Sequence, residues 1–145
     1  MGISLKLLLR YNKFMVEFII PIFASFTPLF LWPIEQLLPF PEAIEELSII
    51  LLVYPLLRVK NASTAYKSAL AAGFLFSFTE SVLYLSNIAA VGSLETFFFR
   101  LGTTTLVHEF SFLIMLFFGR IKKEYILLGF LISLGVHLLY NYFSV

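Results

Sequence analysis

An apolar and aromatic run, Gly73-Phe74-Leu75-Phe76-Ser77-Phe78-Thr79-Glu80-Ser81-Val82-Leu83-Tyr84, carries one carboxylate, that of Glu80, near its middle. If this run crosses a bilayer, the carboxylate lies at membrane depth, where insertion scales assign a charged side chain a cost of about 2.5–3.5 kcal/mol. Such a side chain normally faces a protein interior or a wet cavity. We therefore expect other intramembrane polar residues to be the partners of Glu80.

The composition is typical of a membrane protein. Of the 145 residues, 60% are hydrophobic and only 13% are charged, whereas soluble domains have about 45–50% apolar and about 25% charged residues. The net charge of +1 gives no reason to expect a nucleic-acid partner. Because the chain has no cysteine, disulfides, a thiolate nucleophile and a cysteine-ligated metal site are excluded. We expect residues 1–145 to form one domain that functions in or at the lipid bilayer.

Five segments approach the length and apolar character of membrane-spanning helices, which need about 20 mostly apolar residues. They cover about Phe14–Trp32, Ala43–Leu57, Ala65–Val91, Leu94–Phe118 and Glu124–Phe143. We predict an all-α, polytopic helix bundle. The prolines before the second segment predict a broken or re-entrant piece over Leu37–Glu42, and with it a cavity on the outer side.

The lysines and arginines near the ends of these segments predict the topology. They fall in three groups, which are Lys6, Arg10 and Lys13; Arg58, Lys60 and Lys67; and Arg120, Lys122 and Lys123. Cytoplasmic loops carry an excess of Lys and Arg. We therefore predict an integral, multi-pass membrane protein with its N-terminus inside and its C-terminus outside, and an odd number of helices fits this topology.

Ionisable residues from four segments fall at one depth when depth is counted at about 1.5 Å per helical residue. Glu80 and His108 lie near the middles of the third and fourth segments, and His137 lies slightly to the outer side of the fifth midpoint. Glu45 and Glu46 lie between the middle and the outer end of the second segment. Since all five levels agree within about 10 Å, we expect one polar centre inside the bundle.

Three chemistries suit such a centre. A metal-activated water would use imidazoles and a carboxylate as zinc ligands and another Glu as general base. A metal-free reaction would use Glu to activate water, and His or Asn to hold the oxyanion. A proton or ion path would use paired Glu and His. In the purely structural alternative, His108, His137 and Asn141 hydrogen-bond neighbouring helices at about 0.6 kcal/mol a pair, but that role does not require five ionisable groups at one depth.

Residue Arg100 has two interpretations. It lies near the outer end of the fourth segment, on the same polar stripe as Thr104, His108 and Ser111. Its side chain either snorkels to the outer membrane surface or is the counter-ion of a glutamate. The sequence leaves both open.

Four short blocks occur in order on four of the segments. Ile44-Glu45-Glu46-Leu47 resembles an EExxK block, and Phe76 to Glu80 forms FxxxE. Arg100 followed by His108 is a third block, and His137-Leu138-Leu139-Tyr140-Asn141 has the form HxxYN. Together they resemble the PrsW family of intramembrane proteases, which is related to the CAAX prenyl endopeptidases and the bacteriocin-processing proteins. Two positions depart from the family pattern, Ile49 in place of Lys and Ser81 in place of Asn.

The resemblance implies an enzyme of the prokaryotic cell membrane that hydrolyses a peptide bond of a membrane-anchored protein. The predicted topology places the cleavage near the extracytoplasmic side. Carried over by position, the implied catalytic residues are Glu45, Glu46, Glu80, His108, His137 and Asn141. In a metalloprotease of this kind, zinc would be held by Glu80, His108 and His137, whereas a glutamate-type enzyme would need no metal.

Three alternatives to an active protease stay open. The first is an inactive homologue, in view of the two departures from the family pattern. The second is a non-catalytic scaffold of a larger complex, similar to the Aph subunit of gamma-secretase, which keeps intramembrane histidines. The third is a small ion or proton carrier, which five helices without an internal repeat make a weaker hypothesis.

Overall fold

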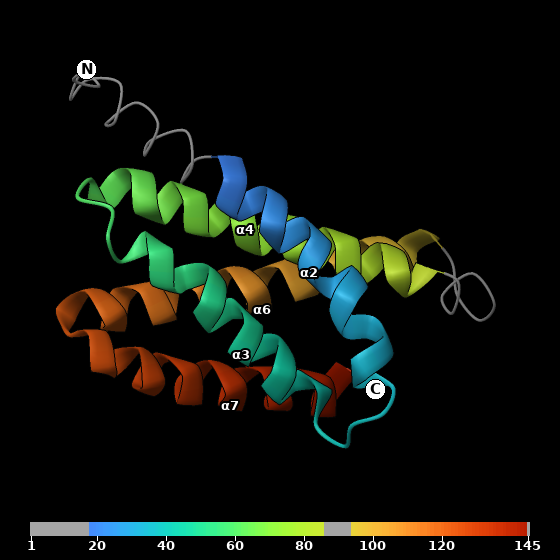
Figure 1. Cartoon of the computed structure of the whole chain (residues 1–145). Coiled ribbons are helices and arrows are strands. Elements are labelled where there is room, and N and C mark those ends of the chain that lie inside the picture. Colours follow the sequence, from blue (N-terminus) through green and yellow to red (C-terminus); the bar gives the residue numbers. More distant parts are fainter. Residues whose placement is uncertain (1–17, 86–93, 145) are drawn as a thin grey trace.

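The computed structural model describes residues 18–85 and 94–144. Within these residues the regular elements are α2 (Ile20–Glu35), α3 (Pro41–Leu56), α4 (Ala62–Leu83), α6 (Leu94–Ile121), the short 3-10 turn η2 (Lys123–Tyr125) and α7 (Ile126–Ser144). Successive helices run in opposite directions along one bundle (Figure 1). The all-α prediction is therefore confirmed for the part of the chain that is described.

Some sequence predictions fall on other parts of the chain. The beginning of the first predicted segment, the end of the third, and the first basic group (Lys6, Arg10 and Lys13) lie outside the described residues. Within the described residues, α4 starts at Ala62, where the Asn61 side chain accepts a 3.1 Å hydrogen bond from Thr64 N. Such a side-chain cap satisfies a backbone N–H that the first helical turn leaves free.

The broken or re-entrant piece predicted over Leu37–Glu42 is a break between two helices, and it is shorter than predicted because it ends at Phe40. A tight turn connects α2 to α3, with backbone hydrogen bonds from Leu37 N to Ile34 O (3.0 Å) and from Leu38 N to Glu35 O (3.3 Å). Pro41 and Glu42 already belong to the first turn of α3. Proline is well accommodated at the first helical position, where its missing N–H has no intrahelical partner to lose. This proline therefore starts a helix instead of breaking one.

Helix α6 is the centre of the bundle and packs against α3, α4 and α7. Two glycines allow close crossings. A Cβ atom on Gly73 of α4 would lie 2.8 Å from the Glu109 Cα of α6, and one on Gly129 of α7 would lie 2.7 Å from the Met115 Cα of α6. Larger residues at these positions would push the helices apart. The close crossings therefore let side chains of α4 and α7 reach those of α6.

The interior is divided into an apolar and a polar half. The apolar core follows the later part of α3 and the earlier part of α4 and lies against the second half of α6; its fully buried members include Ile49, Val53, Leu56, Ala65, Ala69, Phe112, Met115 and Leu116. Buried carboxylates and imidazoles occupy the other half, towards the α2–α3 connection. Because successive helices are antiparallel, the apolar half adjoins the α3–α4 turn.

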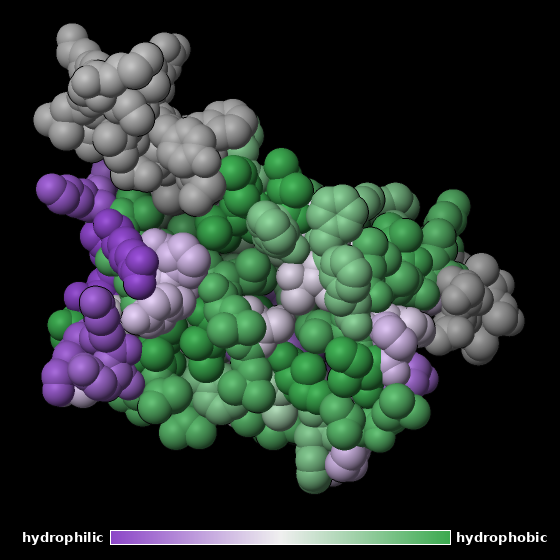
Figure 2. All heavy atoms as spheres, viewed as in Figure 1, coloured by the Kyte–Doolittle hydropathy of each residue, from purple (hydrophilic) through white to green (hydrophobic). Residues whose placement is uncertain are grey.

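Two basic groups meet at the apolar end of the bundle. The Arg120 guanidinium of α6 donates a 3.0 Å hydrogen bond to the Val59 carbonyl in the α3–α4 turn. This contact joins the α3–α4 turn to the α6–η2 turn, and a cavity of about 220 Å³ lies there, lined by Leu57, Gly119, Arg120, Ile121, Lys122 and Lys123. Hydrophilic residues gather at this end in the space-filling view (Figure 2). The second and third basic groups therefore share one end of the molecule, as the predicted topology requires.

Among the described residues, two helices are long and apolar enough to cross a membrane. They are Leu94–Ile121 and Lys123–Phe143, and Ile20–Glu35 is a shorter apolar helix. These helices are consistent with membrane association.

Candidate functional site

Five ionisable side chains from four helices meet in the polar half of the interior. Glu45 and Glu46 come from α3, Glu80 from α4, His108 from α6 and His137 from α7. None of the five is more than 6% exposed. The two imidazole rings lie edge to face with their centroids 5.2 Å apart. The structure thus brings together the residues that the depth count placed at one level.

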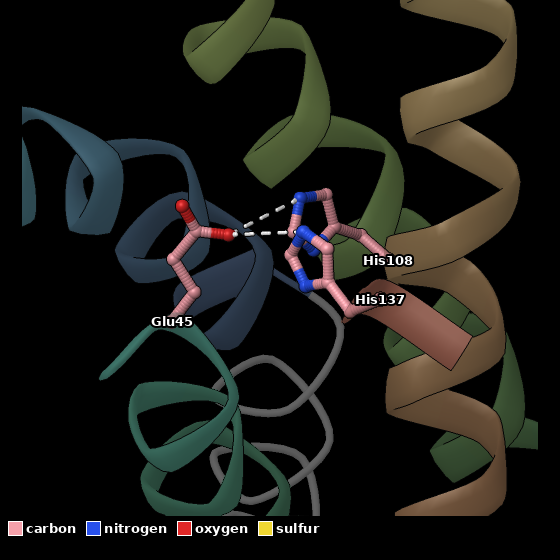
Figure 3. Close-up of side chains that lie close together, drawn as sticks. All are labelled: Glu45, His108 and His137. Carbon is pink, nitrogen blue, oxygen red and sulfur yellow. Dashed lines mark ion pairs between the residues drawn. The ribbon is translucent and has the colours of Figure 1, made fainter. Parts of the chain in front are cut away.

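The Glu45 carboxylate points at both imidazoles (Figure 3). Its Oε2 lies 3.5 Å from His137 Nε2 and 3.9 Å from His108 Nε2. One ligand atom from each of these three residues can be chosen so that all lie within 4.8 Å of one another. Glu45 Oε2 and His108 Nδ1 are buried and have no hydrogen-bond partner. Buried polar atoms rarely go unsatisfied, so these atoms mark the group as one that could hold a metal ion.

The carboxylate in this group differs from the predicted one. The sequence analysis named Glu80 with the two histidines, whereas the structure groups Glu45 with them. Glu80 instead contacts one imidazole directly, with its Oε2 2.6 Å from His108 Nε2, the same nitrogen that lies 3.9 Å from Glu45 Oε2. Its Oε1 accepts a 3.2 Å hydrogen bond from Arg100 Nη2. Arg100 is therefore a counter-ion of Glu80, which decides between its two interpretations.

Aromatic side chains enclose this pair of Glu80 and Arg100. The Arg100 guanidinium lies over the Tyr84 ring, 4.0 Å from its centroid, in the geometry of a cation–π contact. Tyr84 meets Trp32 of α2 edge to face at 4.8 Å, and the Phe76 ring lies 4.6 Å from the His108 ring. These rings pack against the polar centre on the side of α2 and α4.

Glu46 has a different environment from its neighbour Glu45. It is fully buried, and each carboxylate oxygen is occupied. Oε1 accepts hydrogen bonds from Ser111 Oγ (2.9 Å) and His137 Nδ1 (3.0 Å), and Oε2 accepts one from Ser133 Oγ (2.7 Å). Because successive helical residues point about 100° apart, the two adjacent glutamates of α3 share only His137, which they contact at different ring nitrogens. Glu46 is held in place, whereas Glu45 Oε2 is free.

Asn141 lies apart from the imidazole pair. Its Nδ2 donates a 2.8 Å hydrogen bond to Glu42 Oε1, which ties the end of α7 to the first turn of α3. The sequence analysis named Asn141 but missed Ser133, which is fully buried against Glu46. Ser133, His137 and Asn141 are four residues apart in succession, so they share one helix face. This spacing is the signal in the sequence by which Ser133 could have been identified.

The site carries an excess of acidic groups. Glu35, Glu42, Glu46 and Glu80 all lie close enough to Glu45 to interact with it electrostatically. Arg100 compensates one of these charges through its contact with Glu80. A cation bound between Glu45 and the imidazoles would compensate others, since a bound divalent ion is often the largest local charge in such a site.

In comparisons with known proteins, the chain matches no family model, no curated protein and no solved structure.

Proposed function

We propose that this protein is a membrane-embedded endopeptidase that uses a zinc ion held by Glu45, His108 and His137 to hydrolyse a peptide bond of a membrane-anchored protein. One observation carries the proposal. Three buried potential ligands from three helices converge, and two of their polar atoms have no other partner. Buried polar atoms without a partner are few in folded proteins; two of the four among the described residues belong to this group, and the other two are Ser81 Oγ and Arg100 Nε.

Exposed apolar side chains support a multi-pass position in the bilayer. Each helix presents at least one large apolar side chain outward, including Phe30 of α2 (72% exposed), Leu51 of α3 (75%), Phe74 of α4 (46%), Leu106 of α6 (69%) and Leu131 of α7 (62%). Hydrophobic residues cover most of the face seen in Figure 2. Soluble monomers rarely expose contiguous apolar patches larger than a few hundred Å². A lipid environment accounts for this surface.

The charge distribution supports an orientation. The basic turns at the apolar end face the cytoplasm under the positive-inside rule. The polar half of the bundle, with the contact between Glu42 and Asn141 at its far end, then lies towards the extracytoplasmic side. We propose that the substrate is cleaved in this half of the membrane or just outside it.

The residues present fit zinc. One carboxylate and two imidazoles form a common ligand set of catalytic zinc sites, which keep a further position open. Ligands in a tetrahedron at about 2.0–2.1 Å from zinc lie about 3.3 Å apart, close to the 3.5 Å from Glu45 Oε2 to His137 Nε2. His108 Nε2 lies 3.9 Å from Glu45 Oε2 and 2.6 Å from Glu80 Oε2, so binding of zinc by this nitrogen would replace its contact with Glu80. When bound, zinc would supply a Lewis acid for the scissile carbonyl and a more acidic water.

The remaining side chains divide the other tasks. Glu80 is fixed by Arg100 and His108, which use two of the four lone-pair sites of its carboxylate. We propose that Glu80 would take a proton from the attacking water and return it to the leaving amine. Glu46 accepts three hydrogen bonds and is fully buried, so we assign it no proton transfer.

The resemblance to the PrsW family supports the same proposal. Its four blocks contain the residues that lie at the site, with Glu45 and Glu46 in the first block, Glu80 in the second, His108 in the third and His137 in the fourth. We propose membership of this family on that ground.

The first test is the metal content of protein purified in detergent without chelators. We expect near-stoichiometric zinc in the wild type and in Glu109→Gln, and none in Glu45→Gln. Glu109 follows His108 directly but lies outside the group of ligands, so it is the matched control.

The second test is cleavage of membrane-anchored reporter proteins. We expect cleavage near the extracytoplasmic side, abolished in Glu80→Gln. A zinc-free, folded protein that still cleaves would refute the zinc site and favour the glutamate-type mechanism. A zinc-free protein that cleaves nothing and co-purifies with a larger membrane complex would favour the scaffold.

A further inference from the structure

We propose that Ser111 and Ser133 are positioning residues, which hold the Glu46 carboxylate so that His137 presents its Nε2 lone pair to the metal group. This inference rests on the proposed function, because it assigns to His137 the role of a ligand. It adds two residues that the four sequence blocks do not contain.

The two serines form a clamp, by which we mean the pair of neighbouring hydroxyl groups that contact the two oxygens of the Glu46 carboxylate. Ser111 is on α6 and Ser133 is on α7, and both are fully buried. Each hydroxyl donates to a different oxygen of Glu46, at 2.9 and 2.7 Å, and the two hydroxyl groups also contact each other. The clamp therefore joins three helices at one carboxylate.

The contact with the Glu46 carboxylate determines the tautomer of His137. Glu46 is contacted by both serine hydroxyls, of which Ser111 Oγ also lies 3.0 Å from the Val107 carbonyl, and by His137 Nδ1 at 3.0 Å from Oε1. A carboxylate can only accept hydrogen bonds, so Nδ1 must carry a proton to satisfy this contact. In the neutral ring, Nε2 then carries the lone pair, and Nε2 is the atom 3.5 Å from Glu45 Oε2.

The orientation of the ring follows from the same contacts. Metal-binding histidines almost always donate their other N–H to a carboxylate, carbonyl or water, and loss of that partner typically costs 10–100-fold in metal affinity, as an order of magnitude. Without the clamp, Glu46 keeps one of its three hydrogen-bond donors and is free to rotate. The Nδ1 proton of His137 then loses its fixed acceptor, and the fraction of the tautomer that can bind zinc falls.

A structural hydroxyl elsewhere in the bundle provides the control. Ser77 of α4 is also fully buried and also forms a contact between helices, with Thr105 Oγ1 of α6 at 2.9 Å. Its other hydrogen bonds go to the Gly73 and Phe74 carbonyls of its own helix, and not to the glutamates or imidazoles of the site. Ser77→Ala therefore removes a buried interhelical hydrogen bond without touching the clamp.

The test combines zinc affinity with the tautomer of the zinc-free protein. The chain has only two histidines, so 15N labelling of histidine gives two imidazole spectra, assigned with a His108→Gln variant. We expect the wild type and Ser77→Ala to show the Nδ1–H form of His137. We expect the Ser111→Ala, Ser133→Ala double variant to show a mixture of tautomers and a zinc affinity lowered 10–100-fold, as an order of magnitude for such partners.

The outcomes separate this inference from the proposed function. If the wild type binds no zinc, the proposed zinc site fails, but a shift of the tautomer in the double variant alone would still support the clamp. An unchanged His137 tautomer in the folded double variant would overturn the clamp, even if zinc binds. Ser133→Thr keeps a hydroxyl, so it should restore the Nδ1–H form relative to Ser133→Ala; failure of this rescue would also overturn it.

Discussion

Substitution of Gly73 by alanine should weaken the bundle and the site together. The new Cβ would lie 2.8 Å from Glu109 Cα, whereas ordinary contacts begin at 3.4 Å, so the α4 and α6 backbones must separate by 3.4 − 2.8 = 0.6 Å. Both sides of this contact are backbone and cannot rotate away. Overpacking of this kind costs about 1–3 kcal/mol. Glu80 lies two turns further along α4, so the same separation lengthens its 2.6 Å contact with His108.

The control is an alanine substitution on α6 itself. A Cβ on Gly102 would meet nothing within 4 Å. Both substitutions gain the same helix propensity, about 1 kcal/mol from glycine to alanine. The difference between the unfolding free energies of the two variants therefore isolates the cost of overpacking at Gly73. We would measure unfolding free energies by titration with a denaturing detergent, together with bound zinc in each variant. If Gly73→Ala is as stable as Gly102→Ala and binds as much zinc, the close crossing of α4 and α6 is refuted.

Three further predictions concern topology, charge and packing. Because the chain lacks cysteine, an impermeant thiol reagent should label Leu37→Cys on intact cells and Lys123→Cys only after lysis, and the reverse pattern would contradict the orientation. Arg100→Gln should destabilise the protein by about 1–3 kcal/mol, because the buried Glu80 loses its charged partner; unchanged unfolding in detergent would contradict this pairing. Phe76→Ala removes a fully buried ring that packs on an imidazole and should cost about 3–5 kcal/mol, so a loss below 1 kcal/mol in the same unfolding assay would argue against this packing.

Much of the fold could be predicted from the sequence because apolar length is a local property. Each of the five predicted segments overlaps a helix, and the basic groups of the α3–α4 and α6–η2 turns lie at one end of the bundle. Counting residues along each helix also gave the common depth of the buried glutamates and histidines. The break predicted over Leu37–Glu42 extended too far, to Pro41 and Glu42, because proline composition alone cannot distinguish a break from the first turn of a new helix.

The choice of partners at the site could not be predicted in the same way. The rise of a helix fixes the level of a side chain, but its direction depends on how the helix is rotated about its axis, by about 100° for each residue. That rotation is set by packing, for example by the contact of Gly73 with the backbone of Glu109. Only the tertiary structure could therefore show that Glu45 lies between the Nε2 atoms of both imidazoles, while Glu46 contacts the two serines and the Nδ1 atom of His137.

The sequence by itself determined that the chain forms apolar helices with a band of ionisable residues at one level, because hydropathy and helical rise are properties of each segment alone. The tertiary structure decided which members of that band touch. It grouped Glu45 with His108 and His137, paired Arg100 with Glu80, and brought Ser133 into hydrogen-bond contact with Glu46. These contacts depend on the rotation and spacing of helices against one another, which only close packing between distant parts of the chain can fix.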